Sequence, residues 1–226
     1  MAIEDFGGTV AGKKIEVVFG DHTNKADVGA TKARTWFDQD GVDTIVDLNN
    51  TSVSLAVYTL AKERGKLLLN TAAASDSLTN EHCIPTAIHY TFDTYAFASG
   101  AVHGLAERGK KSWYIVAVDY AFGKAGAESI TKVVGESGGK VLGKSFHPLG
   151  ASDFSSFMLP AQQSTADVVT FANAGVDTVN AIKSAREFGL HTKQTIVPQI
   201  MFISDVKALG LQQAQGLVFA TAFYWD

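Results

Sequence analysis

Short apolar segments alternate with helix-length segments along almost the whole chain of 226 residues, and this alternation constrains the fold more than any other feature. The apolar segments predict strands at 15–19, 44–46, 67–69, 112–118, 140–145, 168–171, 195–197 and 217–220. The segments between them predict helices at 27–38, 53–64, 94–107, 125–135, 154–163 and 177–188. Apolar strands separated by helices of this length favour a mostly parallel sheet with helices on both faces. The alternation therefore predicts an α/β protein.

Two successive strands end in small polar residues. The strand at 44–46 runs into Asp47-Leu48-Asn49-Asn50-Thr51-Ser52, and the strand at 67–69 runs into 70–76, which contains Ala72, Ala73 and Ala74. Ligands bind at the carboxyl ends of the strands in open α/β sheets, and helix starts favour anions. Thr51 or Ser52 is also a natural cap for the helix at 53–64. Capping alone is therefore an alternative to ligand contact, although the two roles are compatible.

The second half of the chain repeats this layout. The strand at 112–118 runs into Asp119-Tyr120-Ala121-Phe122-Gly123, and the strand at 168–171 runs into Ala172-Asn173-Ala174-Gly175. We therefore predict two lobes, residues 1–109 and 110–226, whose binding edges face each other. Tyr120 and Phe122 either line a pocket or belong to the core.

Charge and known motifs limit the possible functions. The formal net charge is −4 without a basic block, which gives no reason to expect nucleic acid or an anionic membrane as a partner. No segment reaches the ~18 apolar residues of a membrane span, and the first residues do not form a signal peptide. The sequence has no phosphate-binding loop, no nucleophile elbow, no zinc-type spacing and no paired carboxylates. We therefore predict no catalytic residue, no metal and no cofactor.

Two single residues have competing interpretations. His89 lies in Ile88-His89-Tyr90-Thr91-Phe92-Asp93-Thr94-Tyr95, a segment rich in aromatic and hydroxyl groups directly before a helix, which makes it a candidate site residue. Cys83 is the lone cysteine and cannot form an internal disulfide. We expect it to be a small buried apolar residue, with a reactive thiol as the alternative.

Several stretches together resemble the type I periplasmic binding proteins, the solute receptors of ABC importers, in the group of branched-chain amino-acid and amide receptors. The resemblance covers the whole chain in order and includes residues 4–8, 12–18, 40–46, 74–79, 119–123, 152–156 and 185–190. Residues 89–96 and 202–206 look like a subfamily that includes receptors for aromatic acids. The resemblance implies two flavodoxin-like lobes that close around a solute.

The resemblance also implies roles for individual residues. Asn50 and Thr51 would hold the carboxylate of the solute, and Ala72 to Ala74 would offer main-chain groups. Phe122 would be an aromatic lid with Tyr120 beside it, and Asn173 and Asp205 would contribute from the strand ends of the second lobe. Ala74 stands where amino-acid receptors of the group usually have threonine, which suits a ligand without an ammonium group.

The ends of the chain depart from the family pattern. Family members have a strand and a long helix before the Glu4-Asp5-Phe6-Gly7-Gly8 segment, and they continue past Asp226. The fold is therefore expected to be incomplete as written, with its first, central strand missing. Unpaired strand edges would then favour a homodimer or strand exchange between chains.

These features predict a periplasmic, non-enzymatic receptor for a small organic acid, either an aromatic carboxylate or a branched-chain amino acid. It would deliver the solute to an ABC permease in the membrane. A ligand-sensing regulatory domain of the same fold is the alternative, and an α/β enzyme is a further one.

Overall fold

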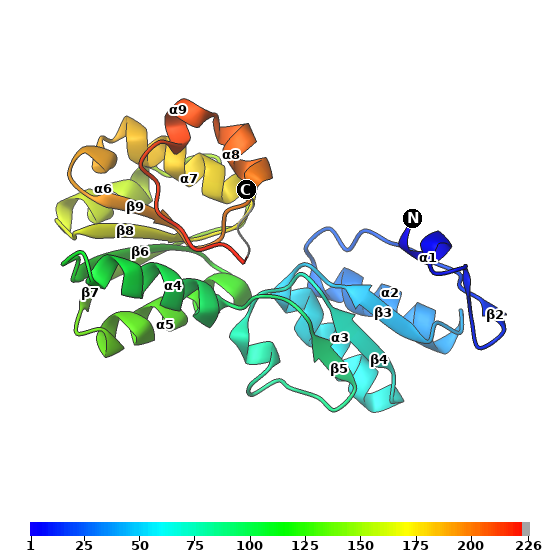
Figure 1. Cartoon of the computed structure of the whole chain (residues 1–226). Coiled ribbons are helices and arrows are strands. Elements are labelled where there is room, and N and C mark those ends of the chain that lie inside the picture. The colour runs from blue at the N-terminus through cyan, green and yellow to red at the C-terminus, as the bar shows by residue number, and fades with distance from the viewer. Residues whose placement is uncertain (223–226) are drawn as a thin grey trace.

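The computed structural model of the protein describes residues 1–222 and contains two groups of elements, each built around a parallel sheet (Figure 1). A three-stranded sheet has the order β3-β4-β5, and a four-stranded sheet has the order β7-β6-β8-β9. All of these strand pairs are parallel. The predicted α/β class with two parallel sheets is therefore confirmed.

The first group surrounds the three-stranded sheet. Its elements are α1 (Ala2–Asp5), β1 (Thr9–Val10), β2 (Lys13–Lys14), α2 (Ala26–Asp38), β3 (Thr44–Asp47), α3 (Thr51–Arg64), β4 (Leu67–Asn70), the 3-10 helix η1 (Asp76–Leu78) and β5 (Ala87–His89). Ile45 and Leu68 are register partners on β3 and β4, and both are buried in one cluster with Val53 and Val57 of α3. One face of this sheet therefore packs against helices.

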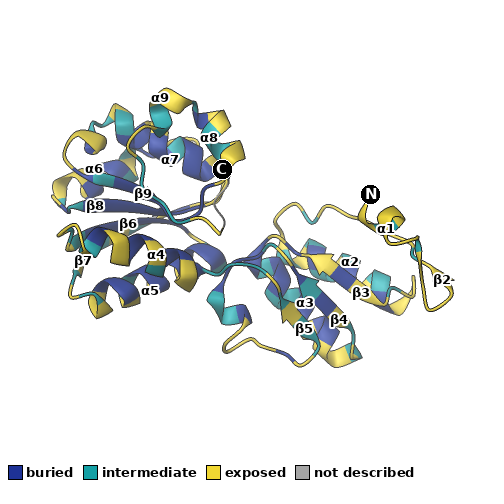
Figure 2. Cartoon of the chain, in the orientation of Figure 1, coloured by how far each residue is buried: buried dark blue, intermediate teal, exposed yellow. Residues whose placement is uncertain are grey.

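The predicted strand at 15–19 is wrong. Val17, Val18 and Phe19 are 64%, 53% and 94% exposed, and the strand that precedes them, β2, ends at Lys14 and pairs antiparallel with β1. Figure 2 shows this part of the chain almost entirely exposed. A strand needs a hydrogen-bonding neighbour, and no strand of the described chain pairs with 15–19. The apolar composition of the segment is therefore not sufficient to make it a strand.

The second group surrounds the four-stranded sheet. Its elements are α4 (Thr94–Ala106), β6 (Ser112–Val118), α5 (Ala121–Glu136), β7 (Lys140–His147), α6 (Ser155–Gln163), β8 (Val168–Ala172), α7 (Val176–Glu187), the 3-10 helix η2 (Leu190–Thr192), β9 (Thr195–Pro198), α8 (Ile203–Leu209) and α9 (Leu211–Ala214). Trp113 and Ile115 of β6 pack with α4 and α5, whereas Tyr114 and Val116 pack with α6 and α7. This sheet is covered on both faces, as Figure 1 also shows.

Helix α4 packs with the second group. Its residues Ala98 and Leu105 share a hydrophobic cluster with Trp113 of β6. The predicted ranges 1–109 and 110–226 divide the chain after this helix rather than before it. We therefore propose that the chain passes from the first lobe to the second at residues 90–93, which connect β5 to α4.

Several local predictions need correction. The segment at 217–220 is not a strand, although the backbone N–H of Val218 donates to the carbonyl of Ile196 on β9 at 3.3 Å. Strand β5 and helix α8 were not predicted, because both are short and lack a clear apolar pattern. Cys83 is exposed rather than buried, since it lies in the loop between η1 and β5.

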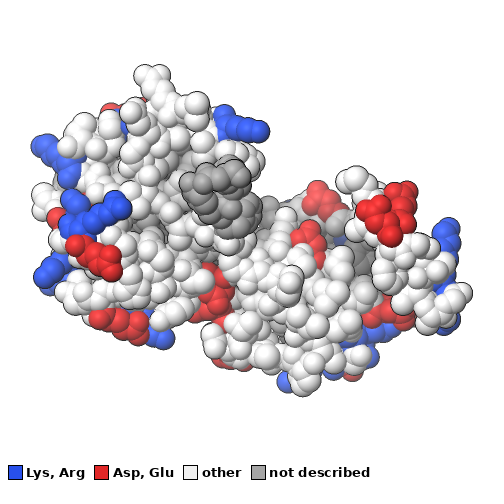
Figure 3. All heavy atoms as spheres, viewed as in Figure 1, with Lys and Arg blue, Asp and Glu red and all other residues white. Residues whose placement is uncertain are grey.

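The surface carries charges of both signs. Figure 3 shows lysine and arginine interspersed with acidic residues over the face in view. Among residues 1–222, no helix has the length and apolar character needed to cross a membrane.

Candidate ligand-binding site

The carboxyl end of β3 leads into α3 through a strained turn. Asp47 and Leu48 have φ angles of 78° and 63°, which are uncommon for residues other than glycine. The hydroxyl of Ser54 donates to the carbonyl of Leu48 at 2.9 Å and holds the turn against the helix. Backbone strain of this kind persists where surrounding contacts enforce it, often at functional sites.

Asn50 caps α3. Its side-chain oxygen accepts a hydrogen bond from the backbone N–H of Val53 at 3.2 Å. The expectation that Thr51 or Ser52 caps the helix is therefore wrong, and the helix begins at Thr51, two residues earlier than predicted. Since one cap satisfies one of the free N–H groups of the first turn, others remain for a ligand.

Thr51 has an unusual environment for a hydroxyl. Its side chain is 1% exposed, and within the described part of the chain its Oγ1 has no hydrogen-bond partner. It lies on the first turn of a 14-residue helix, where the helix dipole favours a negative charge. An unpaired buried hydroxyl at this place is ready to donate to a carboxylate.

The polar segment after the predicted strand at 15–19 contacts the start of α3. The side-chain amide of Asn50 donates to Oδ1 of Asn24 at 3.3 Å, and Nε2 of His22 lies 2.9 Å from Oδ1 of Asn49. His22 and Asn24 were not singled out from the sequence. Their position in a polar run directly after an apolar segment, the same pattern that identified Asn50, is the signal that could have found them.

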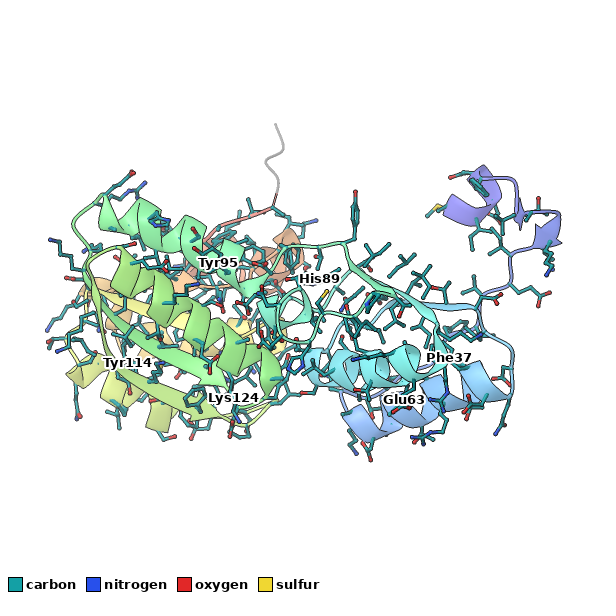
Figure 4. All side chains as sticks on the ribbon, turned by 90° about the horizontal axis from the view of Figure 1, so that it is seen from below. Phe37, Glu63, His89, Tyr95, Tyr114 and Lys124 are labelled. Atoms are coloured by element: carbon teal, nitrogen blue, oxygen red, sulfur yellow. The ribbon has the colours of Figure 1, made fainter. Side chains whose placement is uncertain are left out.

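The loop after β4 forms a fixed turn. Oδ1 of the fully buried Asn70 accepts from the backbone N–H groups of Ala72 and Ala73 at 3.2 and 3.0 Å. Nε2 of His89 lies 2.6 Å from the carbonyl oxygen of Ala73, and Figure 4 shows His89 near the junction of the two groups of elements. The imidazole of His89 thus contacts the turn itself. The role predicted for His89 and for the alanines in binding a solute stays a prediction.

An apolar cluster joins the two lobes. Ala74 from the first lobe is buried together with Val118, Phe122 and Ile200 from the second, and Tyr120 packs against them. The ring centroids of Tyr120 and Phe122 lie 5.9 Å apart. The structure therefore brings three of the predicted site residues, Ala74, Tyr120 and Phe122, to one place between the lobes.

Phe92 and Phe202, two aromatic residues of this region, were not among the predicted site residues. Phe92 packs against the same cluster, 4.6 Å from Phe97 and 5.6 Å from Phe202 between ring centroids. Phe92 belongs to the same aromatic segment as His89. The composition of this segment therefore indicated the region correctly, although the sequence analysis selected only the histidine from it. Of these rings, Phe97 is 3% exposed and belongs to the core, whereas Phe92 is half-buried and Phe202 is exposed.

A hydrogen-bond network fixes the two lobes beside this cluster. Thr94, the first residue of α4, donates from Oγ1 to Oδ1 of Asp76 at 2.9 Å and accepts from the hydroxyl of Ser129 on α5 at 3.1 Å. The backbone N–H of Thr94 donates to the carbonyl of Ala74 at 2.7 Å. The loop that carries Ala74 is thereby tied to the second lobe.

Tyr120 is neutral over the physiological pH range. Burial raises the pKa of its hydroxyl to about 12, and the nearby carboxylate of Asp177 adds to this shift. Asp177, 4% exposed, accepts a hydrogen bond from the backbone N–H of Gly150 at 3.1 Å. The phenol of Tyr120 is therefore available as a hydrogen-bond donor rather than as an anion.

Asn173 follows β8 and is fully buried. Its Oδ1 lies 2.9 Å from Nε2 of His147, the last residue of β7. Within the described residues, Nδ2 of Asn173 has no partner, and neither has Oγ1 of the buried Thr178 on α7. His147 and Thr178 were not predicted, because their contact with this edge depends on strand pairing and burial.

Asp205 lies in a different setting from the one predicted. It is in the first turn of α8 rather than at a strand end, and its carboxylate accepts from the backbone N–H of Phe202 at 2.8 Å. This carboxylate closes the start of α8. The predicted contact with a solute stays a prediction.

The described part of the chain contains no group of three or more His, Cys, Asp or Glu side chains that could hold a metal ion. The chemistry available at this site is hydrogen bonding, helix-start electrostatics and aromatic contact. Such an arrangement can bind a small acid.

A family model described as periplasmic binding protein matches residues 1–226, and the chain belongs to this family. The family comprises solute-binding receptors of ABC transporters. A search of curated proteins finds no match.

Solved structures agree with this assignment. A periplasmic binding protein from Burkholderia mallei is 49% identical with a TM-score of 0.96, over 100% of this chain and 60% of that one. A branched chain amino acid ABC transporter periplasmic ligand-binding protein from Burkholderia xenovorans is 35% identical with a TM-score of 0.80, over 100% and 60%. A solute binding protein from R. palustris in complex with 4-hydroxybenzoate is 23% identical with a TM-score of 0.84, over 92% and 57%, which shows the fold alone. The chain thus spans about 60% of the length of the first two structures.

Proposed function

We propose that the chain binds a small aromatic carboxylic acid between its two lobes. The observation that carries this proposal is the buried hydroxyl of Thr51 at the start of α3, which has no hydrogen-bond partner among residues 1–222. The carboxylate would accept hydrogen bonds from this hydroxyl and from free N–H groups of the first turn. The ring would lie against the aromatic cluster that includes Phe122 and Tyr120. Asn50 would orient the first turn of α3 through its cap.

The biological role follows from the family. We propose a periplasmic receptor that delivers its solute to an ABC permease in the membrane and performs no catalysis. The predicted homodimer or strand exchange is not needed for this role and finds no support in the comparisons.

A branched-chain amino acid is the second candidate. It is favoured by the name of the 35% identical protein from Burkholderia xenovorans. Ala74 supports the aromatic acid instead, because its methyl group cannot accept a hydrogen bond from an ammonium group. The cluster around Ala74 is apolar and aromatic.

Calorimetric titration with benzoate, 4-hydroxybenzoate, leucine and valine separates the candidates. We expect an aromatic acid to bind and the amino acids not to bind. Binding of leucine or valine without any aromatic acid would favour the second candidate, and the absence of all binding would refute both.

A matched pair of variants tests the role of Thr51. Thr51→Val keeps the shape of the side chain and removes the hydroxyl, and Thr59→Val does the same at an exposed position of the same helix. Since a hydrogen bond to a charged group contributes about 1.5–3 kcal/mol, we expect Thr51→Val to weaken binding at least about tenfold. Thr59→Val should leave the affinity unchanged. Equal affinities for the two variants would exclude a contact between Thr51 and the carboxylate.

A further inference from the structure

His147 lies between two oxygen atoms. Its Nδ1 is 2.9 Å from the carbonyl oxygen of Pro148, and its Nε2 is 2.9 Å from Oδ1 of Asn173. The side chain is fully buried and packs against the rings of Phe154 and Phe157, at centroid distances of 4.6 and 5.7 Å. A neutral imidazole carries one N–H group, so it cannot donate to both oxygens.

The hydrogen-bond balance at the ring decides which nitrogen carries the proton. The carbonyl of Pro148 can accept but not donate, so Nδ1 must carry the hydrogen of that bond. A second proton on Nε2 would place an unpaired positive charge in the interior, which is costly. Among the described residues, no acidic side chain forms an ion pair with His147. The neutral Nδ1–H form satisfies these conditions.

This form determines the orientation of the Asn173 amide. Nε2 of His147 is then an acceptor, and the Asn173 amide must turn its NH₂ group toward it. The two orientations of an amide have nearly the same shape, so hydrogen-bond partners decide between them. After this rotation, Oδ1 of Asn173 occupies the former position of Nδ2, which has no hydrogen-bond partner in the described part of the chain.

We propose that His147 is a positioning residue that turns the carbonyl oxygen of Asn173 toward the solute, where it accepts a hydrogen bond from a ring hydroxyl. The solute class would then be hydroxylated aromatic acids rather than unsubstituted ones. This inference rests on the proposed function, because it assigns a hydrogen-bond acceptor to the end of the solute that lies opposite its carboxylate.

The position of Asn173 supports this role. It follows β8 directly, and β8 pairs with β6, whose carboxyl end leads to Tyr120. The three residues after Asn173 are exposed, so Asn173 lies just beneath the surface of this edge. The titratable groups near this edge are Asp119 and Tyr120 after β6, Asp153 in the loop between β7 and α6, and Asp177 in the first turn of α7. A buried acceptor without a donor is rare in proteins, and a ligand hydroxyl supplies that donor.

The protonation of His147 can be measured directly. A long-range ¹⁵N–¹H spectrum of the solute-free chain at pH 7 distinguishes the two neutral tautomers and the imidazolium, and His147→Gln identifies the signal. We expect the neutral Nδ1–H form. An Nε2–H form or an imidazolium would overturn the inference, whether or not any solute binds.

Relative affinity tests the contact with the solute. The dissociation constants of benzoate and of 3- and 4-hydroxybenzoate are compared by calorimetry, and the measured quantity is the ratio between hydroxylated and unsubstituted acid. Because a site built for a hydroxyl discriminates against an analogue that lacks it, we expect at least one hydroxybenzoate to bind about tenfold more tightly or better. Equal affinities would overturn this inference and leave the proposed function intact. Absence of binding by all three would overturn both.

Three variants separate positioning from a general structural role. Asn173→Leu and His147→Phe should reduce the affinity ratio to about one, because each removes the oriented acceptor. His147→Gln should restore part of the ratio, since its amide can donate to Pro148 and accept from Asn173. An affinity ratio that stays at the wild-type value in a folded Asn173→Leu protein would contradict the proposal. Circular dichroism checks that each variant folds.

Discussion

The two sheets differ in how many of their faces are covered. Every residue of β8 and all of β6 after its first residue are buried, because α4 and α5 pack on one face and α6 and α7 on the other. In the three-stranded sheet one face packs against helices, whereas Val46, Leu69 and Ile88, in register on the opposite face, stay partly or largely exposed. The same kind of apolar strand thus meets two different environments in one chain.

This difference shows that an apolar strand is stabilised by what packs against it. Burial of a valine side chain contributes about 1.5–3 kcal/mol. Valines in β6 obtain this contribution, and Val46 in β3, at 56% exposed, obtains less than half of it. The four-stranded sheet should therefore be the more stable part of the molecule.

A matched pair of valine substitutions, one in each sheet, tests the difference in burial, and we expect it to change the free energy of unfolding more than any other substitution proposed below. Val116→Ala removes two fully buried methyl groups from β6, and Val46→Ala makes the same change at an exposed position of β3. We expect Val116→Ala to lower the free energy of unfolding by about 2–3 kcal/mol, and Val46→Ala to change it by less than about 0.5 kcal/mol. Urea denaturation measures both, with Trp113 in the second lobe and Trp36 in the first as fluorescent probes. Equal losses would contradict the difference between the sheets.

Alanine substitutions of two helix caps, one in each lobe, should have the next largest effect on stability. Asn50 caps α3 in the first lobe, and Asp93 caps α4, accepting from the N–H of Ala96 at 2.7 Å. Each substitution by alanine should cost about 1 kcal/mol of stability. Asn50→Ala should also weaken binding of an aromatic acid, whereas Asp93→Ala should not. Equal affinities of the two variants would show that Asn50 has only a structural role.

The second sheet is stabilised by a carboxylate whose contribution to the free energy of unfolding depends on pH. Asp167 precedes β8, and hydrogen bonds from the Ser112 hydroxyl at 2.7 Å and from the N–H groups of Ser112 and Lys111 lower its pKa. A lowered pKa stabilises the folded chain above the ordinary value of about 3.9, and this stability is lost as the pH falls through the folded-state pKa. Since Asp167 is partly exposed, we expect Asp167→Asn to cost about 1 kcal/mol at pH 7, and the difference from wild type should disappear at strongly acidic pH.

Asp43→Asn is the control for this experiment, because Asp43 is exposed and forms no side-chain hydrogen bond or ion pair among the described residues. Its unfolding free energy should follow that of the wild type at each pH. A difference between Asp167→Asn and wild type that persists at acidic pH would show that the carboxylate charge is not responsible.

Cys83 should give the smallest effect. It is exposed in the loop between η1 and β5, so a thiol reagent such as DTNB should modify it in the folded chain. Cys83→Ser should change the free energy of unfolding by less than about 0.5 kcal/mol. A thiol that reacts only in denaturant would show that the loop covers it.

The strand pattern predicted most of the fold, because β6, β8 and β9 are apolar runs in which every residue after the first is buried. The strand at 15–19 was predicted by the same rule and is wrong, since a strand also needs a neighbour to pair with. Polar residues at strand ends predicted Asn50, Thr51 and Asn173 at the edges where the structure places them. The environment of Asn173 could not be predicted, because His147 reaches it through the lateral order of β7, β6 and β8.

In the proposed function both lobes contribute to a single site, and a ¹⁵N-resolved NMR titration with 4-hydroxybenzoate can detect both contributions at once. We expect the amide signals of Thr51 and Ala74 in the first lobe and of Phe122 and Asn173 in the second to shift together, with one common dissociation constant. Shifts confined to one lobe, or no shifts at millimolar solute, would contradict a single site shared by both lobes.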